Sequence, residues 1–516
     1  MAAEKADLVL HDGAVFGHPG QDSVAVAGGR VVACGRFGEL KSLVGPGTRL
    51  VRLGGRTVAP GFIDCHLHFM EAASVAAGLS MQRCRTIGEL LADLRVASGK
   101  TPPGNWMRAY GCDEALIHER RGPTRIELDQ SVPKNPLRLR HQTLHGSWLN
   151  SRAINLLGLE HPDFKPPEGA ILQRDASGRL TGLVAGMEEW LSNHLPRVTG
   201  SELEARVRGF SRELAAAGVT AFTDATVRNG PEEVTLFGRI KASGAISQRM
   251  SVMVGGGTPL LAASRAAETA RMGLAGVKFM DVTRWEAPRL VRTVADAMAQ
   301  GMDCAFHATE VEELEATLQV IAAVRERVPG RALESAFCRI EHGGLIPPDY
   351  PERIAALEAW VVTNPGFIYY RGAKYAAEPG LIPYLYRARS LAAAGVRLAA
   401  GSDAPVTPAR PLAAIAAAMA RVSAEGYELA PEERITAQEA FALFTSAAAE
   451  LARIPAGDVA PGYLADLIVL AGDPLGLAPA ELANLNVDLT IVGGRIVYER
   501  GRPLASQNPG ASLFSA

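Results

Sequence analysis

The sequence predicts an α/β fold in which a TIM-type (β/α)8 barrel is joined to a small β-sandwich. Three features of the 516-residue chain lead to this prediction: eight apolar segments alternate with helical patterns, short strand patterns occur at both ends, and one long stretch separates the first two apolar segments. Continuous apolar runs are typical of parallel strands that are buried on both faces. Eight such strands alternating with helices form a closed barrel, whose active site lies at the C-terminal ends of the strands.

The barrel strands are expected where the apolar runs lie, at residues 61–66, 218–224, 249–254, 275–280, 302–307, 337–342, 359–363 and 396–401. The stretch between the first two strands is too long for a simple crossover connection. We therefore expect residues from about 70 to 200 to form an insertion after barrel strand 1. Insertions at the C-terminal end of a barrel usually shape the substrate pocket.

Strand patterns punctuated by glycine occupy both ends of the chain. They lie at residues 7–10, 24–26, 30–33 and 48–53, and again at 465–470 and 489–498. Runs of this length bounded by glycine turns are typical of antiparallel sheets. Because the middle of the chain is so different, we expect the two ends to build one β-sandwich. The predicted domains are residues 1–58 and 450–516 for the sandwich and 59–449 for the barrel.

The composition favours a globular protein that acts on a small molecule. A net charge of -2 with mixed signs argues against nucleic acid and against an anionic membrane surface as partners. The sequence shows neither a signal-peptide pattern nor an apolar run long enough to cross a membrane, so a cytoplasmic location is expected. The six cysteines are dispersed and include no Cys-x-x-Cys pair, which indicates reduced core residues.

Six polar residues at the ends of the expected strands form the candidate site. His66 and His68 are two residues apart on the first strand, where alternate side chains share a face. The others lie on strands four, five, six and eight: Lys278, His307, His342 and Asp403. Taken singly, each could be a satisfied core histidine, a lysine that reaches solvent or an aspartate that caps a turn. Together, at strand ends in this order, they indicate a metal centre.

The residue types in this set constrain its chemistry. Neutral imidazoles and a carboxylate suit Zn²⁺ or a similar divalent ion, which lowers the pKa of bound water to about 7. An ammonium group cannot bind a metal. Lys278 therefore fits the set only if its amine is neutralised, and reaction with CO₂ would turn it into a carbamate with two oxygens able to bridge two metals.

Four further segments carry a resemblance to a known family: residues 58–64 (VAPGFID), 144–153 (LHGSWLNSRA), 218–224 (GVTAFTD) and 339–342 (RIEH). With the six strand-end residues, they make the whole chain similar to the amidohydrolase superfamily, and more closely to amidohydrolase family 3, its YtcJ-like branch. After strand five the branch usually reads HAIGDRA, whereas this chain reads HATEVE from His307 onward.

The resemblance implies a distorted barrel and two divalent metal ions, with Zn²⁺ the expected ion. Carboxylated Lys278 would bridge the ions. His66, His68 and Asp403 would hold the buried metal, and His307 and His342 the more exposed one. The family also leads us to expect a homo-oligomer, a dimer or larger.

These roles predict a hydrolase acting on an amide, N-acyl or N-formyl C–N bond. A metal-bridging hydroxide would attack the carbonyl, and Asp403 would move its proton to the leaving nitrogen. His145 is a candidate for oxyanion stabilisation or substrate contact. Further candidate substrate contacts follow strands four and seven: Arg284, Trp285, Tyr369, Tyr370 and Arg371.

Two other enzyme classes and one non-enzymatic role remain open. Deaminases on the same scaffold generally use one metal and no bridging lysine, so Lys278 counts against a mononuclear deaminase. A lactone or ester hydrolase is a further alternative. A non-catalytic assembly protein would typically lack several ligands, whereas all six are present here.

Overall fold

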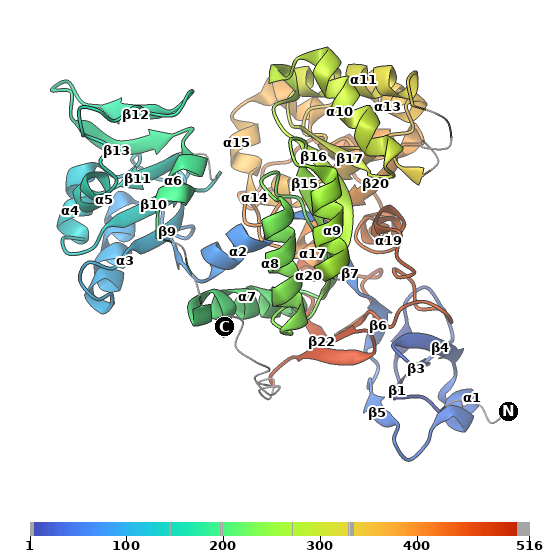
Figure 1. Ribbon diagram of the computed structural model, residues 1–516. Helices are drawn as coiled ribbons and strands as arrows, with labels where there is room; N and C mark the ends of the chain where they lie inside the picture. Colours follow the sequence, from blue (N-terminus) through green and yellow to red (C-terminus); the bar gives the residue numbers. More distant parts are fainter. Residues whose placement is uncertain are drawn as a thin grey trace. The chain divides into compact units, whose positions relative to one another are not determined.

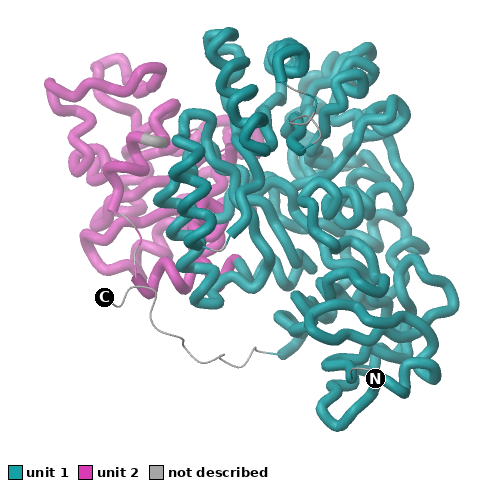
Figure 2. Tube along the Cα trace, turned by 45° about the vertical axis from the view of Figure 1, so that its right-hand side comes forward, with its two compact units in different colours: residues 1–69, 211–516 teal, residues 70–210 magenta. Residues whose placement is uncertain are grey.

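The computed structural model describes residues 5–143, 146–196, 198, 200–270, 272–328, 330 and 335–502. The chain divides into two compact units (Figure 2). Unit 1 combines residues 1–69 with residues 211–516, and unit 2 comprises residues 70–210. Unit 1 contains the barrel and the sandwich, and unit 2 is the long insertion that follows the first barrel strand.

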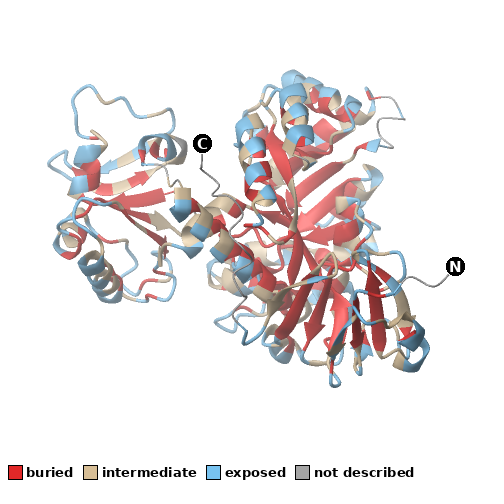
Figure 3. Ribbon diagram, turned by 60° about the horizontal axis from the view of Figure 1, so that its bottom comes forward, coloured by how far each residue is buried: buried red, intermediate tan, exposed pale blue. Residues whose placement is uncertain are grey.

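Eight parallel strands form the barrel and confirm the predicted fold class. In hydrogen-bonded order they are β7 (Phe62–Leu67), β14 (Val219–Asp224), β15 (Arg249–Gly255), β16 (Gly273–Phe279), β17 (Cys304–Ala308), β18 (Cys338–His342), β19 (Trp360–Thr363) and β20 (Arg397–Ala400). Most residues of these strands are buried (Figure 3). Helices cover the outside of the barrel, and the inward-pointing side chains of the strands fill its interior. This explains why each strand reads as a continuous apolar run.

The helices that alternate with the barrel strands lie around the outside of the barrel (Figure 1). They are α8 (Pro231–Ala242), α9 (Leu260–Ala270), α10 (Ala287–Ala299), α11 (Val311–Arg325), α13 (Tyr350–Ala356) and α16 (Ala388–Ala393). In α10, for example, the buried residues Leu290, Val294 and Ala297 recur at helical spacing. After β19 and β20 the chain forms α14 (Gly366–Tyr370), α15 (Gly372–Ala376), α17 (Pro411–Ala420), α18 (Ala437–Ala442) and α19 (Ser446–Ala452).

The barrel closes where its first and last strands meet. The amide of Asp403 donates to the carbonyl of His66 at 2.7 Å, and the amide of His68 donates to the carbonyl of Ala404 at 2.8 Å. The approach is close enough to require glycine, since a Cβ at Gly401 would lie 2.6 Å from the backbone nitrogen of His66. The backbone of the predicted metal ligands therefore forms the seam of the barrel.

Both ends of the chain build the predicted sandwich. One sheet contains β1 (Leu8–His11), β3 (Ser23–Ala27), β4 (Arg30–Gly35) and β5 (Arg49–Arg52). The other joins β2 (Ala14–Val15) and β6 (Thr57–Pro60) to β21 (Leu467–Leu470), β22 (Val487–Val492) and β23 (Arg495–Glu499). Val58 of β6 pairs with Val469 of β21, so the two ends of the chain share one sheet. Side chains of both sheets share one apolar core, in which Leu10 and Val469 are fully buried.

Unit 2 has its own mixed sheet, with strands in the order β12-β13-β11-β10-β9-β8. Their bounds are β8 (Leu79–Ser80), β9 (Met107–Cys112), β10 (Leu137–His141), β11 (Gly146–Leu149), β12 (Ile171–Arg174) and β13 (Leu180–Ala185). The helices are α2 (Phe69–Ala76), α3 (Ile87–Lys100), α4 (Arg125–Ser131), α5 (Ser151–Leu156), α6 (Glu188–His194) and α7 (Gly200–Ala216), of which α7 leads back to unit 1. No helix in the described part of the chain is long and apolar enough to cross a membrane.

Lys241, near the end of α8, makes stability depend on alkaline pH. Its Nζ donates to the carbonyls of Ile246, at 3.1 Å, and Gln248. Burial, and then the charge of Arg249, lowers the pKa of Lys241 from 10.5 to about 8. Between pH 8 and pH 10.5 the unfolded chain binds more protons at Lys241 than the folded chain does, so the free energy of unfolding rises with pH. The contribution of Lys241 to stability is least favourable below pH 8. We expect that rise, about 3 kcal/mol, to be lost in Lys241→Met.

Chemical denaturation of wild type and variant at several pH values between 7 and 10.5 measures this effect, because the difference between the two proteins cancels the titration of other groups. Equal pH slopes in the two proteins would show that Lys241 does not titrate abnormally.

Candidate metal centre

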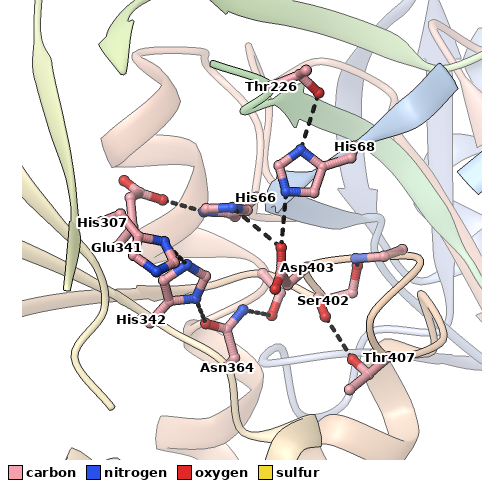
Figure 4. Close-up of polar contacts among 12 residues, drawn as sticks. His66, His68, Thr226, His307, Glu341, His342, Asn364, Ser402, Asp403 and Thr407 are labelled. Atoms are coloured by element: carbon pink, nitrogen blue, oxygen red, sulfur yellow. Dashed lines mark hydrogen bonds and ion pairs between the residues drawn. The ribbon is translucent and has the colours of Figure 1, made fainter. Parts of the chain in front are cut away.

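Three predicted ligands converge at the seam of the barrel (Figure 4). The Nε2 atoms of His66 and His68 lie 3.4 and 3.1 Å from the same carboxylate oxygen, Oδ1 of Asp403. One ligand atom from each residue lies within 4.8 Å of the others. His66 is 1% exposed and Asp403 is 7% exposed, whereas 25% of the His68 side chain is exposed, so solvent reaches the triad on the His68 side. Two imidazoles and a carboxylate at this spacing can share one divalent cation.

The backbone that carries the triad is held by a buried carboxylate. Oδ1 of Asp64 accepts hydrogen bonds from the amide of His66, at 3.2 Å, and from the amide of Ser402, at 3.0 Å. Asp403 itself adopts a left-handed conformation with φ of 56°, which is uncommon outside glycine. Such a conformation persists only where surrounding contacts fix it, and here the seam hydrogen bonds do so.

His307 and His342 lie beside the triad. Nε2 of His342 is 3.0 Å from Nδ1 of His307, and the ring centroids of His66 and His342 are 4.8 Å apart. His342 ends β18 with φ of 72°, and His307 lies near the end of the neighbouring strand β17. The structure therefore brings four histidines and Asp403 to one place, as the strand order predicted.

Polar contacts at Nδ1 orient the rings of three histidines. Nδ1 of His66 contacts the Glu341 carboxylate, and Nδ1 of His68 lies 3.0 Å from Oγ1 of Thr226. Nδ1 of His342 lies 2.8 Å from Oδ1 of Asn364. The Asn364 amide is itself oriented, because its Nδ2 donates to the carbonyl of Gly401 at 2.8 Å. In this structure the Nε2 atoms of these rings contact Asp403 or His307, and a bound metal would replace those contacts. The ring proton would then lie on Nδ1, with the Nε2 lone pair directed at the metal.

The charge states in the cluster also suit a cation. Burial, helped by the charge of Lys278, lowers the pKa of His307 to about 4, and burial with the charge of His307 lowers the pKa of His342 well below its usual value. Although burial alone raises the pKa of Asp403, hydrogen bonds from His66 and His68 hold that pKa well below its usual range. The rings of His307 and His342 are therefore neutral at pH 7 and the Asp403 carboxylate is charged.

Lys278 is the group that a metal centre explains best. Its residue is 1% exposed, and its Nζ has no hydrogen-bond partner among the described residues. Burial lowers the pKa of Lys278 from 10.5 to about 8, although the charge of Glu341 opposes the shift. A buried amine without a partner is costly unless it is neutralised or modified. The residues present therefore fit a divalent metal.

A buried charge network next to the triad was not predicted from the sequence. Arg339 and Glu341 lie two residues apart on β18 and share the interior face of the barrel. The guanidinium of Arg339 pairs with the Glu341 carboxylate and also donates to the carbonyl of Cys65 at 2.9 Å. Although burial alone raises the pKa of Glu341, the charges of Arg339 and Lys278 hold it well below its usual range. The sequence signal that could have revealed this network is a pair of opposite charges, two residues apart, in a strand predicted to be buried.

This network should tune metal affinity. Glu341→Gln removes the negative charge that orients His66 and increases the basicity of its Nε2. We expect metal affinity to fall about 10- to 100-fold, measured by competition with a chelator. Glu433→Gln is a matched control, because Glu433 is also buried and pairs with an arginine, Arg387, at 3.0 Å. If both variants bind metal equally well, the Glu341 carboxylate has no part in the site.

The remaining predicted site residues have varied positions. His145 lies outside the described residues. Arg284 is exposed in the short helix η2 (Val282–Arg284), and the Trp285 ring packs edge-on against Phe279 at 5.8 Å. Tyr369 and Tyr370 end α14, and Tyr369 is 39% exposed. Arg371 follows at the junction of α14 and α15.

Residues 49–498 match the sequence profile of the amidohydrolase family. The N-substituted formamide deformylase of Arthrobacter pascens is 28% identical over 519 aligned residues, which cover 93% of this chain and 95% of that protein. The putative amidohydrolase YtcJ of Bacillus subtilis strain 168 is 24% identical over an alignment that covers 93% of this chain and 96% of its own.

The fold is shared with a solved structure, that of an uncharacterized metal-dependent hydrolase from Pyrococcus horikoshii OT3. The two superimpose with a TM-score of 0.71 at 21% identity, over 92% of this chain and 99% of the other. Together with the sequence matches, this confirms the family resemblance that the strand-end residues and the four segments predicted.

Proposed function

Because this chain belongs to the amidohydrolase family, we propose that it hydrolyses a C–N bond of a small amide, N-acyl or N-formyl compound. The observation that carries the proposal is the convergence of four histidines, Asp403 and a buried lysine without a partner at the C-terminal ends of the barrel strands. The similarity to an N-substituted formamide deformylase over nearly the whole chain supports the N-formyl class in particular.

The ligands divide into two sets in this proposal. His66, His68 and Asp403 would hold one divalent ion, and His307 and His342 a second, with Zn²⁺ the expected ion at both. Lys278, carboxylated by CO₂, would lie between them. When bound, such ions polarise the substrate carbonyl and lower the pKa of water. The lowered pKa of Lys278 supports its modification, since only a neutral amine reacts with CO₂.

Asp403 has the central role among the chain's own residues. Its carboxylate stays charged at neutral pH, so it can accept a proton from the attacking water and deliver it to the leaving nitrogen. Water oxygen bonds to the carbonyl carbon, the C–N bond breaks, and the amine leaves with the transferred proton. Glu341, Thr226 and Asn364 keep the imidazoles oriented during this exchange.

The test combines metal analysis with a substrate panel. The protein is expressed with bicarbonate and Zn²⁺, its metal content is measured by mass spectrometry, and release of amine from N-formyl and N-acetyl amines is followed. We expect turnover that is lost on chelation and restored by Zn²⁺. Release of ammonia from aminopurines, with no cleavage of the amides, would reject the proposal in favour of a deaminase.

A further inference from the structure

Phe367 and Tyr386 form an aromatic wall beside His342, one of the proposed metal ligands. The ring of Phe367, on α14, stacks against His342 with a centroid distance of 6.4 Å and an interplanar angle of 23°. The ring of Tyr386 packs edge-on against the ring of Phe367 with a centroid distance of 5.7 Å. The amide of Tyr386 donates to the carbonyl of Gly344, just after β18. Phe367 and Tyr386 belong to an apolar cluster that also contains Leu345 and Ile368.

Two partly buried tyrosine hydroxyls continue this wall. The phenol oxygens of Tyr375 and Tyr386 are 3.1 Å apart. Burial raises the pKa of both phenols, the positive charge of Arg371 lowers it in each case, and the negative charge of Asp403 raises it. The amide of Tyr375 donates to the carbonyl of Arg371 at 3.4 Å, so the hydroxyl pair is tied to the segment that carries Arg371.

Arg371 is a partly buried cation next to this wall. It follows Phe367 by four residues and its amide donates to the Phe367 carbonyl at 2.9 Å, so the two side chains share one side of the helix. Nη1 of Arg371 is buried and has no hydrogen-bond partner among the described residues. By contrast, the guanidinium groups of the buried Arg339 and the partly buried Arg387 each pair with a glutamate.

We infer that Arg371 binds a carboxylate of the substrate, so that the preferred substrates are N-acyl or N-formyl compounds with an acidic group and an apolar group on the amine side. A guanidinium matches a carboxylate with two parallel hydrogen bonds, and it gains most where water is excluded. The aromatic wall would hold the apolar group, while the metal ligands face the scissile carbonyl. This inference rests on the proposed function and specifies its substrate class.

Two substrates that differ only in the acidic group test the inference. N-formylphenylalanine, supplied as each enantiomer, carries the carboxylate, and N-formyl-2-phenylethylamine lacks it. We expect the wild type to cleave one enantiomer of the acid with a kcat/KM about 10- to 100-fold higher than that for the neutral substrate. Arg371→Met should remove that preference, with little change for the neutral substrate, and Arg371→Lys should restore part of it.

Lys374→Met is the matched control, because Lys374 is an exposed cation in α15, three residues after Arg371. It removes the same charge and should keep the preference for the acid. Melting temperature and metal content of each variant show whether it is folded and loaded. Equal kcat/KM for acid and neutral substrate in the wild type, or an unchanged preference in Arg371→Met, would overturn the inference.

Binding of 3-phenylpropanoate separates this inference from the proposed function, because this acid has no C–N bond to cleave. Calorimetry should show binding that weakens about 10-fold or more in Arg371→Met and is unchanged in Lys374→Met. If neither formyl compound is cleaved but binding follows this pattern, the hydrolase proposal fails and the carboxylate site stands. Binding that does not depend on Arg371 overturns the site whether or not the amides are cleaved.

Discussion

Replacing Asp403 by asparagine is expected to lower kcat for amide hydrolysis by about 10²- to 10⁴-fold. Asparagine keeps the size of the side chain and one oxygen that can bind a metal, but its amide cannot accept a proton. The seam hydrogen bond from residue 403 to the carbonyl of His66 is made by the backbone, so it survives the change. The measurement is kcat per bound metal ion, on a formyl compound that the wild type cleaves.

Dividing by metal content separates loss of the proton acceptor from loss of a ligand. Thr407→Val is a control for disturbance of the same loop, because Oγ1 of Thr407 donates to the carbonyl of Ser402 at 2.5 Å. It should cost about 1 kcal/mol of stability without a comparable loss of kcat. If Asp403→Asn loses no more kcat per metal than Thr407→Val, proton transfer belongs to another group.

Replacing Lys278 by methionine should have opposite effects on the metal-free and metal-loaded protein. In the metal-free protein it removes a buried amine that has no partner among the described residues, so the free energy of unfolding should rise by about 1–3 kcal/mol. In the loaded protein it removes the ligand that we propose bridges two ions, so metal content should fall from the proposed two ions per chain to about one or fewer. Denaturation after chelation measures the first effect, and mass spectrometry the second.

Lys241→Met is the control for Lys278→Met, because it shows what removing another lysine of low exposure does to metal content. The Nζ of Lys241 already donates to two carbonyls, so its replacement should leave metal content unchanged. A metal content in Lys278→Met equal to that of the wild type would refute the bridging role. Destabilisation of the metal-free Lys278→Met protein would show that the amine contributes favourable contacts of its own.

The barrel and the positions of the candidate ligands on its strands were predictable because both follow from local sequence. A parallel strand buried on both faces must be apolar, so each run shows where a strand lies, and a polar residue at its C-terminal end shows where a side chain enters the mouth. His307 and His342 could therefore be predicted from the sequence alone. The sandwich followed from similar reasoning, since glycine-bounded strands at the two ends had no other partner.

Other parts depend on contacts that the sequence does not encode locally. The pairing of Glu341 with His66 joins strands far apart in the chain, and Arg339 and Glu341 read alone contradict a buried strand. The sheet of unit 2 includes β8, only two residues long, which leaves almost no periodic signal. That Nη1 of Arg371 lacks a hydrogen-bond partner among the described residues is a property of its surroundings, and no pattern in the chain announces it.

The seam has a consequence for how the chain reaches its working state. Asp64 and Ser402, which tie the two sides of the seam together, are 338 residues apart in sequence. Contacts at such a separation carry a large loop-closure entropy, and during folding they are favoured only after most of the chain between them is ordered. A growing chain therefore presents His66 and His68 long before Asp403 exists to complete their site. The ability to bind metal at the triad is acquired in the last stage of barrel folding.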